Sequence, residues 1–310
     1  MVIFILPLAM LAQGFYNANA WRRFRHEIRI EFGASNFLGE VGGRDRLGSN
    51  FIWDLELSQT KFSASFNHLY YLSEKVGLRT SINYGKVSGD DALTTESYRN
   101  NRNLHFQSII VESGMSVEWH FLKDKPGNIY NVRSVTGKKL GKKGINSGFY
   151  VTGGIHAFYF NPQALAPSGQ WVDLKPLSTE GQGFPDGAKE YNRVSVAVPI
   201  GGGWRKNISR TVGLKLELTH RFTFTDYIDD ISTVYYDPNI LSAEISQTAA
   251  YLSNPHLGNK RPIVTEPGQQ RGDSSDNDGY MFLTAGVYFK LQNKGNVYGR
   301  NKVKRVKASF

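Results

Sequence analysis

Cysteine is absent from the 310-residue chain. Disulfides, thiolate nucleophiles and zinc sites with cysteine ligands are therefore excluded. Beyond its N-terminal segment the chain also lacks any apolar run of the ~20 residues that a transmembrane helix requires. If the mature protein crosses a membrane, it crosses as β-strands.

Motifs for catalysis and for nucleotide or metal binding are also missing. There is no G-x-S-x-G nucleophile elbow, and the glycine- and lysine-rich run at 137–144 lacks the Walker spacing and its Ser or Thr. No histidine pair has the H-E-x-x-H spacing, and four histidines fall in separate predicted strands: His68, His120, His156 and His220. We therefore expect no enzymatic activity, no cofactor and no bound metal.

Charge and short motifs do not identify a ligand. The net charge of +10 permits binding to nucleic acid or to an anionic surface but specifies neither, and we expect no nucleic-acid partner. The Arg-Gly-Asp tripeptide at 271–273 matches an adhesion motif. Three common loop residues coincide often by chance, so we attach no function to it.

The residues that are abundant favour β-structure. Aromatic residues make up 13% of the chain, and it contains 32 glycines. Aromatic side chains suit strands and glycines suit the turns between them. The composition therefore predicts an all-β protein.

The stretch 210–239 shows the pattern most clearly. One face of its predicted strand is apolar: Val212, Leu214, Leu216 and Leu218. The other face is polar or charged: Gly213, Lys215, Glu217, Thr219 and Arg221. Aromatic residues and then an acidic segment follow. This order of apolar face, charged face, aromatic rim and polar loop is typical of an outer-membrane β-barrel strand.

Alternation of this kind predicts eight strands, at about 26–37, 62–72, 76–87, 104–121, 149–160, 194–204, 210–222 and 280–291. Long connections follow the first, third, fifth and seventh strands, and short ones follow the second and sixth. The long basic connection after the fourth breaks this rhythm. Both faces of the fifth strand are apolar, so it cannot be oriented, and Pro199 predicts a bulge or bend in the sixth. We predict an eight-stranded antiparallel outer-membrane barrel of the OmpA or OmpX type, with long extracellular loops.

The charged faces of these strands must line the interior. A Lys or Arg that faces lipid at the midplane costs about 2–4 kcal/mol, so the whole set turned outward would cost on the order of 15 kcal/mol, comparable to the stability of a domain. We predict that these residues pair across the lumen: Glu27, Arg29, Glu31, Arg79, Glu112, Glu118, Lys215, Glu217 and Arg221. A structural plug is the favoured interpretation, and a proton or ion pathway is the alternative.

The ends of the chain indicate export. Residues 1–20 resemble a secretory signal peptide, with an apolar run and an Ala-Asn-Ala cleavage site before Trp21. We expect a barrel over 21–291 and a basic tail over 292–310, in the outer membrane with both termini periplasmic. Strand parity then places two basic runs on the periplasmic side, where they would dock a partner: Lys138, Lys139, Lys142, Lys143, Lys302, Lys304, Arg305 and Lys307. Solvated faces or weak binding of lipid headgroups are the alternatives.

The acidic clusters of the long connections fall at the opposite end. These clusters are Asp90-Asp91, Asp229-Asp230 and Asp273 to Asp278. With both termini periplasmic, we expect them to lie outside the cell, facing away from the basic runs.

Loop motifs carry a resemblance to a known family. They are Ser88-Gly89-Asp90-Asp91, Asn161-Pro162-Gln163-Ala164, Thr179-Glu180-Gly181-Gln182-Gly183, Thr225-Asp226-Tyr227-Ile228-Asp229-Asp230 and Val234-Tyr235-Tyr236-Asp237. Together they resemble the PorG family (DUF6089-like) of Bacteroidetes outer-membrane barrels over nearly the whole mature chain. The basic insertion at 123–146 and the first loop at 37–40 depart from the family pattern.

The resemblance implies a component of the type IX secretion system. It implies a barrel that sits in outer-membrane lipid and is linked to a periplasmic ring of a lipoprotein and its partner, with a role in motility in gliding species. Two other classes remain as alternatives. An outer-membrane lipid hydrolase would show a Ser and His within hydrogen-bond reach at the outer rim, and a soluble lipocalin-like barrel would show a polar exterior and an apolar lumen.

Overall fold

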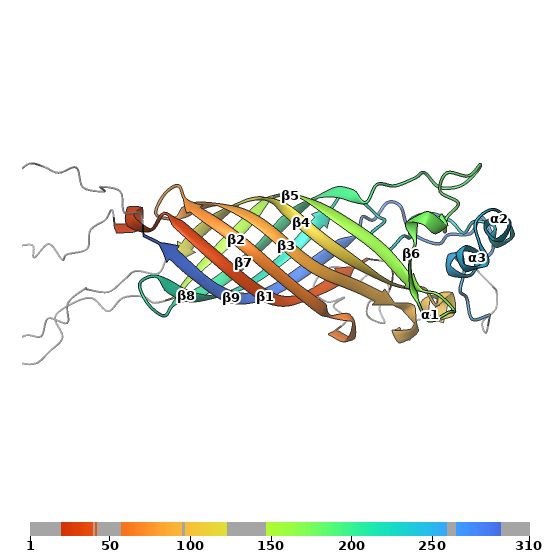
Figure 1. Cartoon of the computed structure of the whole chain (residues 1–310), viewed down its shortest axis with the longest axis horizontal. Helices are drawn as coiled ribbons and strands as arrows, with labels where there is room; N and C mark the ends of the chain where they lie inside the picture. The colour runs from red at the N-terminus through yellow and green to blue at the C-terminus, as the bar shows by residue number, and fades with distance from the viewer. Residues whose placement is uncertain are drawn as a thin grey trace, which may run out of the picture.

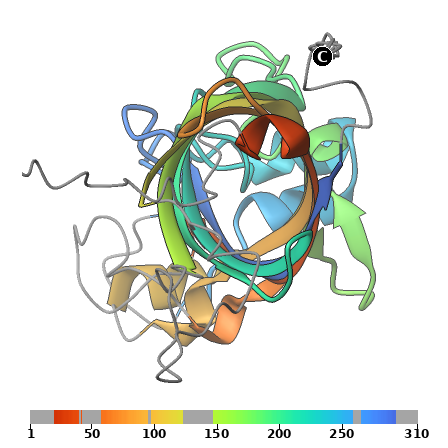
Figure 2. The same cartoon turned by 90° about the vertical axis from the view of Figure 1, so that its left-hand side faces the viewer.

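The computed structural model describes residues 20–39, 41, 57–94, 97–122, 147–258 and 265–292. Antiparallel strands form a closed ring in chain order (Figure 2). They are β1 His26–Leu38, β2 Lys61–Tyr71, β3 Val76–Asp90, β4 His105–Leu122, β5 Ser147–Leu165, β7 Val194–Asn207, β8 Val212–Thr223 and β9 Gly279–Leu291. Pairing of β9 with β1 closes the ring. The short β6 Trp171–Asp173 pairs only with the C-terminal end of β5. The eight predicted strands are thus confirmed.

The structure differs from the strand prediction in the ends of two strands and in the absence of a bulge at Pro199. The strands β3 and β5 run on to Asp90 and Leu165, so the segments 88–90 and 161–164 are paired strand rather than loop. Pro199 makes no bulge: Gly153 pairs with Ile200 and His156 with Ala197 in one unbroken register. Because Pro has no N–H to donate, the ladder is only interrupted between these pairs.

Short helices gather at one end of the barrel, shown at the right of Figure 1. They are the 3-10 turns η3 Leu57–Gln59, η4 Asp91–Leu93 and η5 Lys175–Leu177, and the helices α1 Ser97–Arg102, α2 Pro238–Glu244 and α3 Gln247–Ser253. We call this end the cap end. At the opposite end lie the short turns after β2 and β7 and the turn η1 Ala20–Phe24. In the described part of the chain, no helix is long and apolar enough to cross a membrane.

Side-chain caps begin the two longest helices of the described chain, α2 and α3. The Asp237 carboxylate accepts a hydrogen bond from the Asn239 amide at 2.8 Å, and Pro238 stands at the first helical position of α2. The Ser246 hydroxyl accepts from the Ala249 amide at 3.1 Å and starts α3. Both caps satisfy backbone donors that a helix N-terminus leaves unpaired. The sequence prediction missed these helices because each is too short to show a helical period.

The outer surface of the barrel is apolar. Exposed fractions reach 68% for Ile155, 60% for Met115 and 57% for Ile82. On β5 the outward side chains run from Phe149 to Tyr159, and at ~3.3 Å per residue and a tilt of about 40° this span covers roughly 25 Å along the barrel axis, the height of the lipid-facing band of such barrels. The fold is therefore an outer-membrane type of transmembrane β-barrel.

Aromatic side chains mark both edges of the apolar surface. Near the short-turn end, Trp119, Phe121 and Phe149 are exposed. The Phe121 ring contacts Trp119 on one side and Phe149 on the other. Toward the cap end, Tyr159 and Phe224 are exposed. Aromatic girdles at both interfaces are typical of membrane-spanning barrels, so these two sets indicate where the headgroup regions lie.

The interior of β5 can now be oriented. Tyr150, His156, Phe158 and Phe160 are buried in the lumen. Phe158 and Phe160 belong to an apolar cluster that fills the cap-end half of the lumen and includes Phe37, Phe106, Ile110, Tyr280 and Phe282. The lumen therefore has two layers, an apolar one toward the cap end and a charged one below it.

The orientation of the strands predicts the effect of a charge placed on the outer face. Leu216 lies about halfway along β8 with 44% of its surface exposed. We expect Leu216→Lys to destabilise the barrel by about 2–4 kcal/mol, measured by urea unfolding in lipid bilayers. Thr80→Val, at another outward position, is the control and should be tolerated. Normal stability of the Leu216→Lys barrel would mean that the faces are reversed.

Candidate functional sites in the lumen and at the cap

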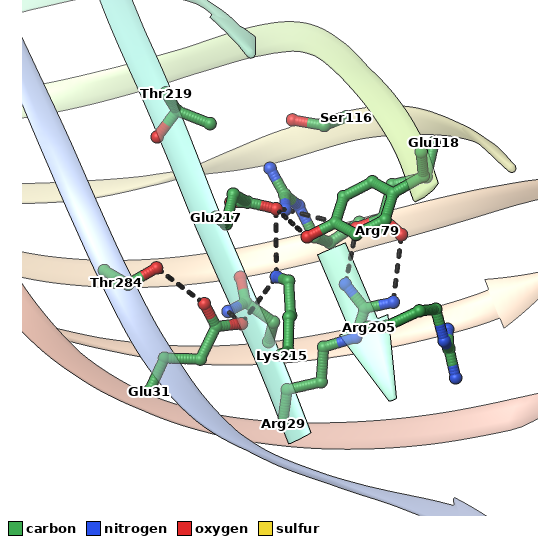
Figure 3. A network of polar contacts seen from close by, with 12 residues as sticks. Arg29, Glu31, Arg79, Ser116, Glu118, Arg205, Lys215, Glu217, Thr219 and Thr284 are labelled. Atoms are coloured by element: carbon green, nitrogen blue, oxygen red, sulfur yellow. Dashed lines mark hydrogen bonds and ion pairs between the residues drawn. The ribbon is translucent and has the colours of Figure 1, made fainter. Parts of the chain in front are cut away.

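The charged layer of the lumen is one continuous chain of side chains with alternating charge. Figure 3 shows the part of it from Arg29 to Glu31. Its members come from β1, β3, β4, β7 and β8, so it crosses the ring rather than following one strand. In the order in which their side chains contact one another, they are Arg205, Glu27, Arg29, Glu118, Arg79, Glu217, Lys215 and Glu31.

The first half of this chain joins β7, β1 and β4. The Arg205 Nη2 atom lies 2.9 Å from Glu27 Oε2, and Arg29 Nε lies 2.7 Å from Glu27 Oε1. The Arg29 guanidinium then turns its two terminal nitrogens to both carboxylate oxygens of Glu118, at 2.5 and 2.9 Å. Such a two-pronged contact fixes both orientation and distance.

The second half joins β4, β3, β8 and β1. The Arg79 Nη1 atom bridges Glu118 at 3.1 Å and Glu217 at 2.7 Å. The Lys215 Nζ atom bridges Glu217 at 2.9 Å and Glu31 at 2.7 Å. Glu217 thus has two basic partners, Arg79 and Lys215.

The remaining predicted pair forms a separate unit nearer the cap end. The Glu112 carboxylate accepts hydrogen bonds from Asn83, from the Tyr280 hydroxyl and from Arg221, at 2.6, 2.6 and 3.2 Å. Arg221 also donates to the hydroxyl of Thr219. Arg221 is therefore a partner of Glu112 and not of Glu217.

A Ser, a His and a Glu are in contact inside the lumen. The Ser116 hydroxyl lies 2.9 Å from His156 Nε2, and His156 Nδ1 lies 2.6 Å from Glu112 Oε1. Ser116 and His156 are only 2% and 1% exposed, and a Cβ on Gly154 would come within 2.3 Å of the Ser116 hydroxyl. No substrate acyl group fits beside this hydroxyl, so the contact is structural, unlike the open rim site expected of a hydrolase.

Sequence reasoning missed Arg205 and the tyrosines of the network. Arg205 was placed in a turn, whereas β7 continues to Asn207 and turns Arg205 inward. Its inward neighbours on β7, Gly201 and Gly203, carry no side chain that could reveal the alternation. The Tyr150 hydroxyl donates to Glu217 at 2.6 Å, and Tyr150 lies on the strand that could not be oriented.

The cap end is held by a second buried polar cluster. Arg271 places Nη1 2.9 Å from Glu180 Oε1 and 2.7 Å from the backbone oxygen of Asp230. The Glu180 carboxylate also accepts from the Ser232 amide at 2.9 Å and from the Thr233 hydroxyl at 2.8 Å. One arginine and one glutamate thus join the long β5–β7 and β8–β9 connections.

Asp230 is the second carboxylate of this cluster. It accepts hydrogen bonds from the Thr179 hydroxyl at 2.5 Å and from the Tyr191 hydroxyl at 2.6 Å. Its backbone is left-handed, with φ of 67°, a conformation that Asp and Asn tolerate better than most residues. Burial raises the pKa of Asp230 to about 6, although Arg271 opposes that shift.

A third connection joins the cap through Arg102. Its guanidinium contacts both carboxylate oxygens of Asp91, at 2.7 and 3.1 Å, and donates to the backbone oxygen of Arg271 at 3.0 Å. Above the lumen, the Tyr191 and Tyr227 rings stack with centroids 4.5 Å apart. The cap therefore closes the barrel mouth with paired charges and stacked rings.

The acidic clusters of the long connections lie at the cap end, opposite the first residue of β1 and the last residue of β9. Asp91, Asp229, Asp230 and Asp278 are buried there. That this end faces the outside of the cell stays a prediction. Arg271, the first residue of the Arg-Gly-Asp tripeptide, is 2% exposed and paired with Glu180. The tripeptide is therefore a structural part of the cap.

The predicted docking residues lie outside the described residues. This holds for Lys138, Lys139, Lys142, Lys143, Lys302, Lys304, Arg305 and Lys307. The predicted signal peptide and basic tail also lie outside them, apart from positions 20 and 292. What the structure does fix is the strand ends that flank these segments: β1 begins and β4 and β9 end at the short-turn end.

Comparison with known proteins gives low similarity. No protein-family model and no curated protein matches the chain. Among solved structures, it is similar to Neisserial surface protein A, with 9% identity, a TM-score of 0.37 and coverage of 86% of this chain and 96% of that one. It is also similar to the attachment invasion locus protein Ail of Yersinia pestis, with 10% identity, a TM-score of 0.31 and coverage of 86% and 99%.

The lumen chain predicts coupled effects of mutations. Removing one partner of a buried ion pair costs about 3–5 kcal/mol because the other charge is left uncompensated. We expect this cost for Glu217→Ala, and we expect Glu217→Ala/Arg79→Ala to cost clearly less than the two single changes added together. Urea unfolding of the four proteins completes the cycle. Additive losses would show that the two side chains are energetically independent.

The raised pKa of Asp230 predicts that the cap becomes less stable as pH rises. Because its pKa is raised in the folded cap, the folded state binds the proton more tightly than the unfolded state, so stability is greatest below about pH 4 and falls until about pH 6. The loss should be on the order of 2–3 kcal/mol. Hydrogen exchange of residues 225–235 should therefore show more opening at about pH 7.5 than at about pH 5. Asp230→Asn should remove this dependence, and an unchanged profile in that variant would assign it to another group.

Proposed function

We propose that this protein is an outer-membrane component of the type IX secretion system that anchors or assembles a periplasmic ring complex. The observation that carries the proposal is the convergence of three of the family-like loop motifs. Glu180, Asp230 and Tyr235 belong to different motifs, yet all are buried at the cap end. A resemblance restricted to chance loop matches would give no reason for these segments to meet in one packed unit.

The closed lumen supports a role as an anchor rather than as a conduit. The charged chain and the apolar cluster fill the interior of the described barrel, and the cap covers its mouth. A barrel of this kind acts through the surfaces that it presents on either side of the membrane. The described strand ends bring the connection 123–146 and the segment after Leu291 to the same end of the barrel, which supports a shared docking face there.

The two alternative classes are less well supported. A lipocalin-like barrel has a polar exterior and an apolar ligand cavity, whereas here the exterior is apolar and half of the lumen is charged. A lipid hydrolase requires a nucleophile that a lipid can reach, whereas the Ser–His contact at Ser116 is buried in the lumen.

The basic tail provides the test. We expect joint replacement of Lys302, Lys304, Arg305 and Lys307 by Gln to leave the barrel inserted but to weaken co-purification of the periplasmic ring proteins. Binding that remains should be more sensitive to salt, because exposed charge pairs are screened over about 8–10 Å at physiological ionic strength.

The controls separate partner docking from lipid binding. Lys61→Gln/Lys189→Gln, at the cap end, should leave co-purification unchanged. Reduced binding to anionic liposomes with full retention of the ring proteins would assign the tail to headgroups. A tail variant that keeps its partner and supports secretion normally would contradict the docking proposal.

A further inference from the structure

A surface pocket of about 330 Å³ lies on the β5–β7 connection. It is lined by side chains of the η5 turn, of the segment that follows it and of the residue before β7. The polar ones are Lys175, Ser178, Gln182, Glu190 and Arg193. None of them takes part in the lumen chain.

The lining of this pocket is rich in hydrogen-bond donors. Lys175 and Arg193 are cations, Ser178 has a hydroxyl and Gln182 has an amide, whereas Glu190 is the one carboxylate that the described lining contains. The formal charge of the lining is thus positive. Such a set suits a ligand that carries several acceptor oxygens and a negative charge.

Two donor atoms of these side chains make no hydrogen bond with the described residues. Gln182 is 6% exposed, and its Oε1 accepts from the Glu180 amide at 3.0 Å, yet its Nε2 is buried without a hydrogen bond. The Arg193 Nε atom is likewise buried and unpaired. The contact of Arg193 with Asp173 is loose, at 3.9 Å. Buried donors left unpaired cost free energy, so an acceptor that reached either atom would stabilise it.

The pocket stands at the edge of the apolar surface. Arg193 Nη1 donates to the hydroxyl of Tyr159 at 3.4 Å, and Tyr159 belongs to the cap-end aromatic girdle. The next residue, Val194, is 62% exposed on the lipid-facing side. The cations are therefore at the height where an outer-leaflet lipid places its headgroup.

We propose that this pocket binds the phosphate group of an anionic lipid in the outer leaflet. Arg193 and Lys175 would contact the phosphate oxygens, as guanidinium and ammonium groups commonly do. The Gln182 amide would donate to the same group. This site is independent of the proposed docking face, which lies at the opposite end of the barrel.

The test compares phosphorylated and dephosphorylated lipid. The purified full-length barrel is placed in phosphatidylcholine nanodiscs doped with diphosphoryl lipid A or with its dephosphorylated form, and bound lipid is counted by native mass spectrometry after detergent release. We expect the wild type to retain the phosphorylated lipid preferentially. Lys175→Gln/Arg193→Gln should weaken retention by about tenfold or more, the ratio expected when charge-assisted hydrogen bonds are lost.

Matched variants control for folding and for net charge. Lys189→Gln/Arg210→Gln removes two exposed cations elsewhere on the described surface and should retain lipid as the wild type does. Lys175→Gln alone leaves the Arg193–Tyr159 contact intact, so a folded barrel with weaker retention is expected even if the double variant misfolds. Equal retention of both lipids by the wild type, or unchanged retention by Lys175→Gln and the double variant, would overturn the proposal.

Inorganic phosphate distinguishes the source of the anion. Thermal stability in sodium phosphate is compared with that in sodium chloride of equal ionic strength. No phosphate-specific stabilisation, together with preferential lipid retention, supports a headgroup site. Stabilisation of the wild type but not of the double variant supports the same anion site and adds soluble phosphate as a ligand.

Discussion

The rest of the structure depends on how narrow the lumen is. Eight strands leave an interior just wide enough for side chains to fill, so a charged group there loses its water. The chain from Arg205 to Glu31 meets this constraint by placing each charge between opposite ones. Outside, the lipid excludes charge altogether. The apolar exterior and the paired interior are thus two results of closing the same ring.

A strand could be oriented from sequence only where its inward and outward residues differ in polarity. On β3 and β8, inward charges alternate with outward apolar residues, and both strands were oriented correctly from sequence. On β5 the contrast disappears, because Phe158 and Phe160 face an apolar part of the lumen while Tyr159 faces the lipid edge. Glycines hid Arg205 for a related reason: a Cβ on Gly203 would come within 2.2 Å of the Tyr150 hydroxyl, so that inward position must stay without a side chain.

The cap could not be predicted because its contacts join segments that share no periodic pattern. Glu180 lies in the β5–β7 connection and Arg271 in the β8–β9 connection, and neither stands in a regular strand or helix. Strand parity indicated at which end of the barrel the acidic residues lie, but it could not show that Asp91 and Asp230 are buried there. Here Arg102 and Arg271 compensate them. Pairing across loops depends on tertiary placement, which composition does not encode.

The alternating chain also constrains the order in which the protein can form. Arg205 and Glu27 are 178 positions apart in the sequence, and Lys215 and Glu31 are 184 apart. The β7 and β8 cations meet their β1 acids only after nearly the whole chain has been added to the sheet. Until then these groups keep their hydration, so the unclosed sheet cannot enter the hydrocarbon core with its inner face exposed to lipid. These pairs with β1 therefore form only as the ring closes, and their long sequence separation favours slow folding.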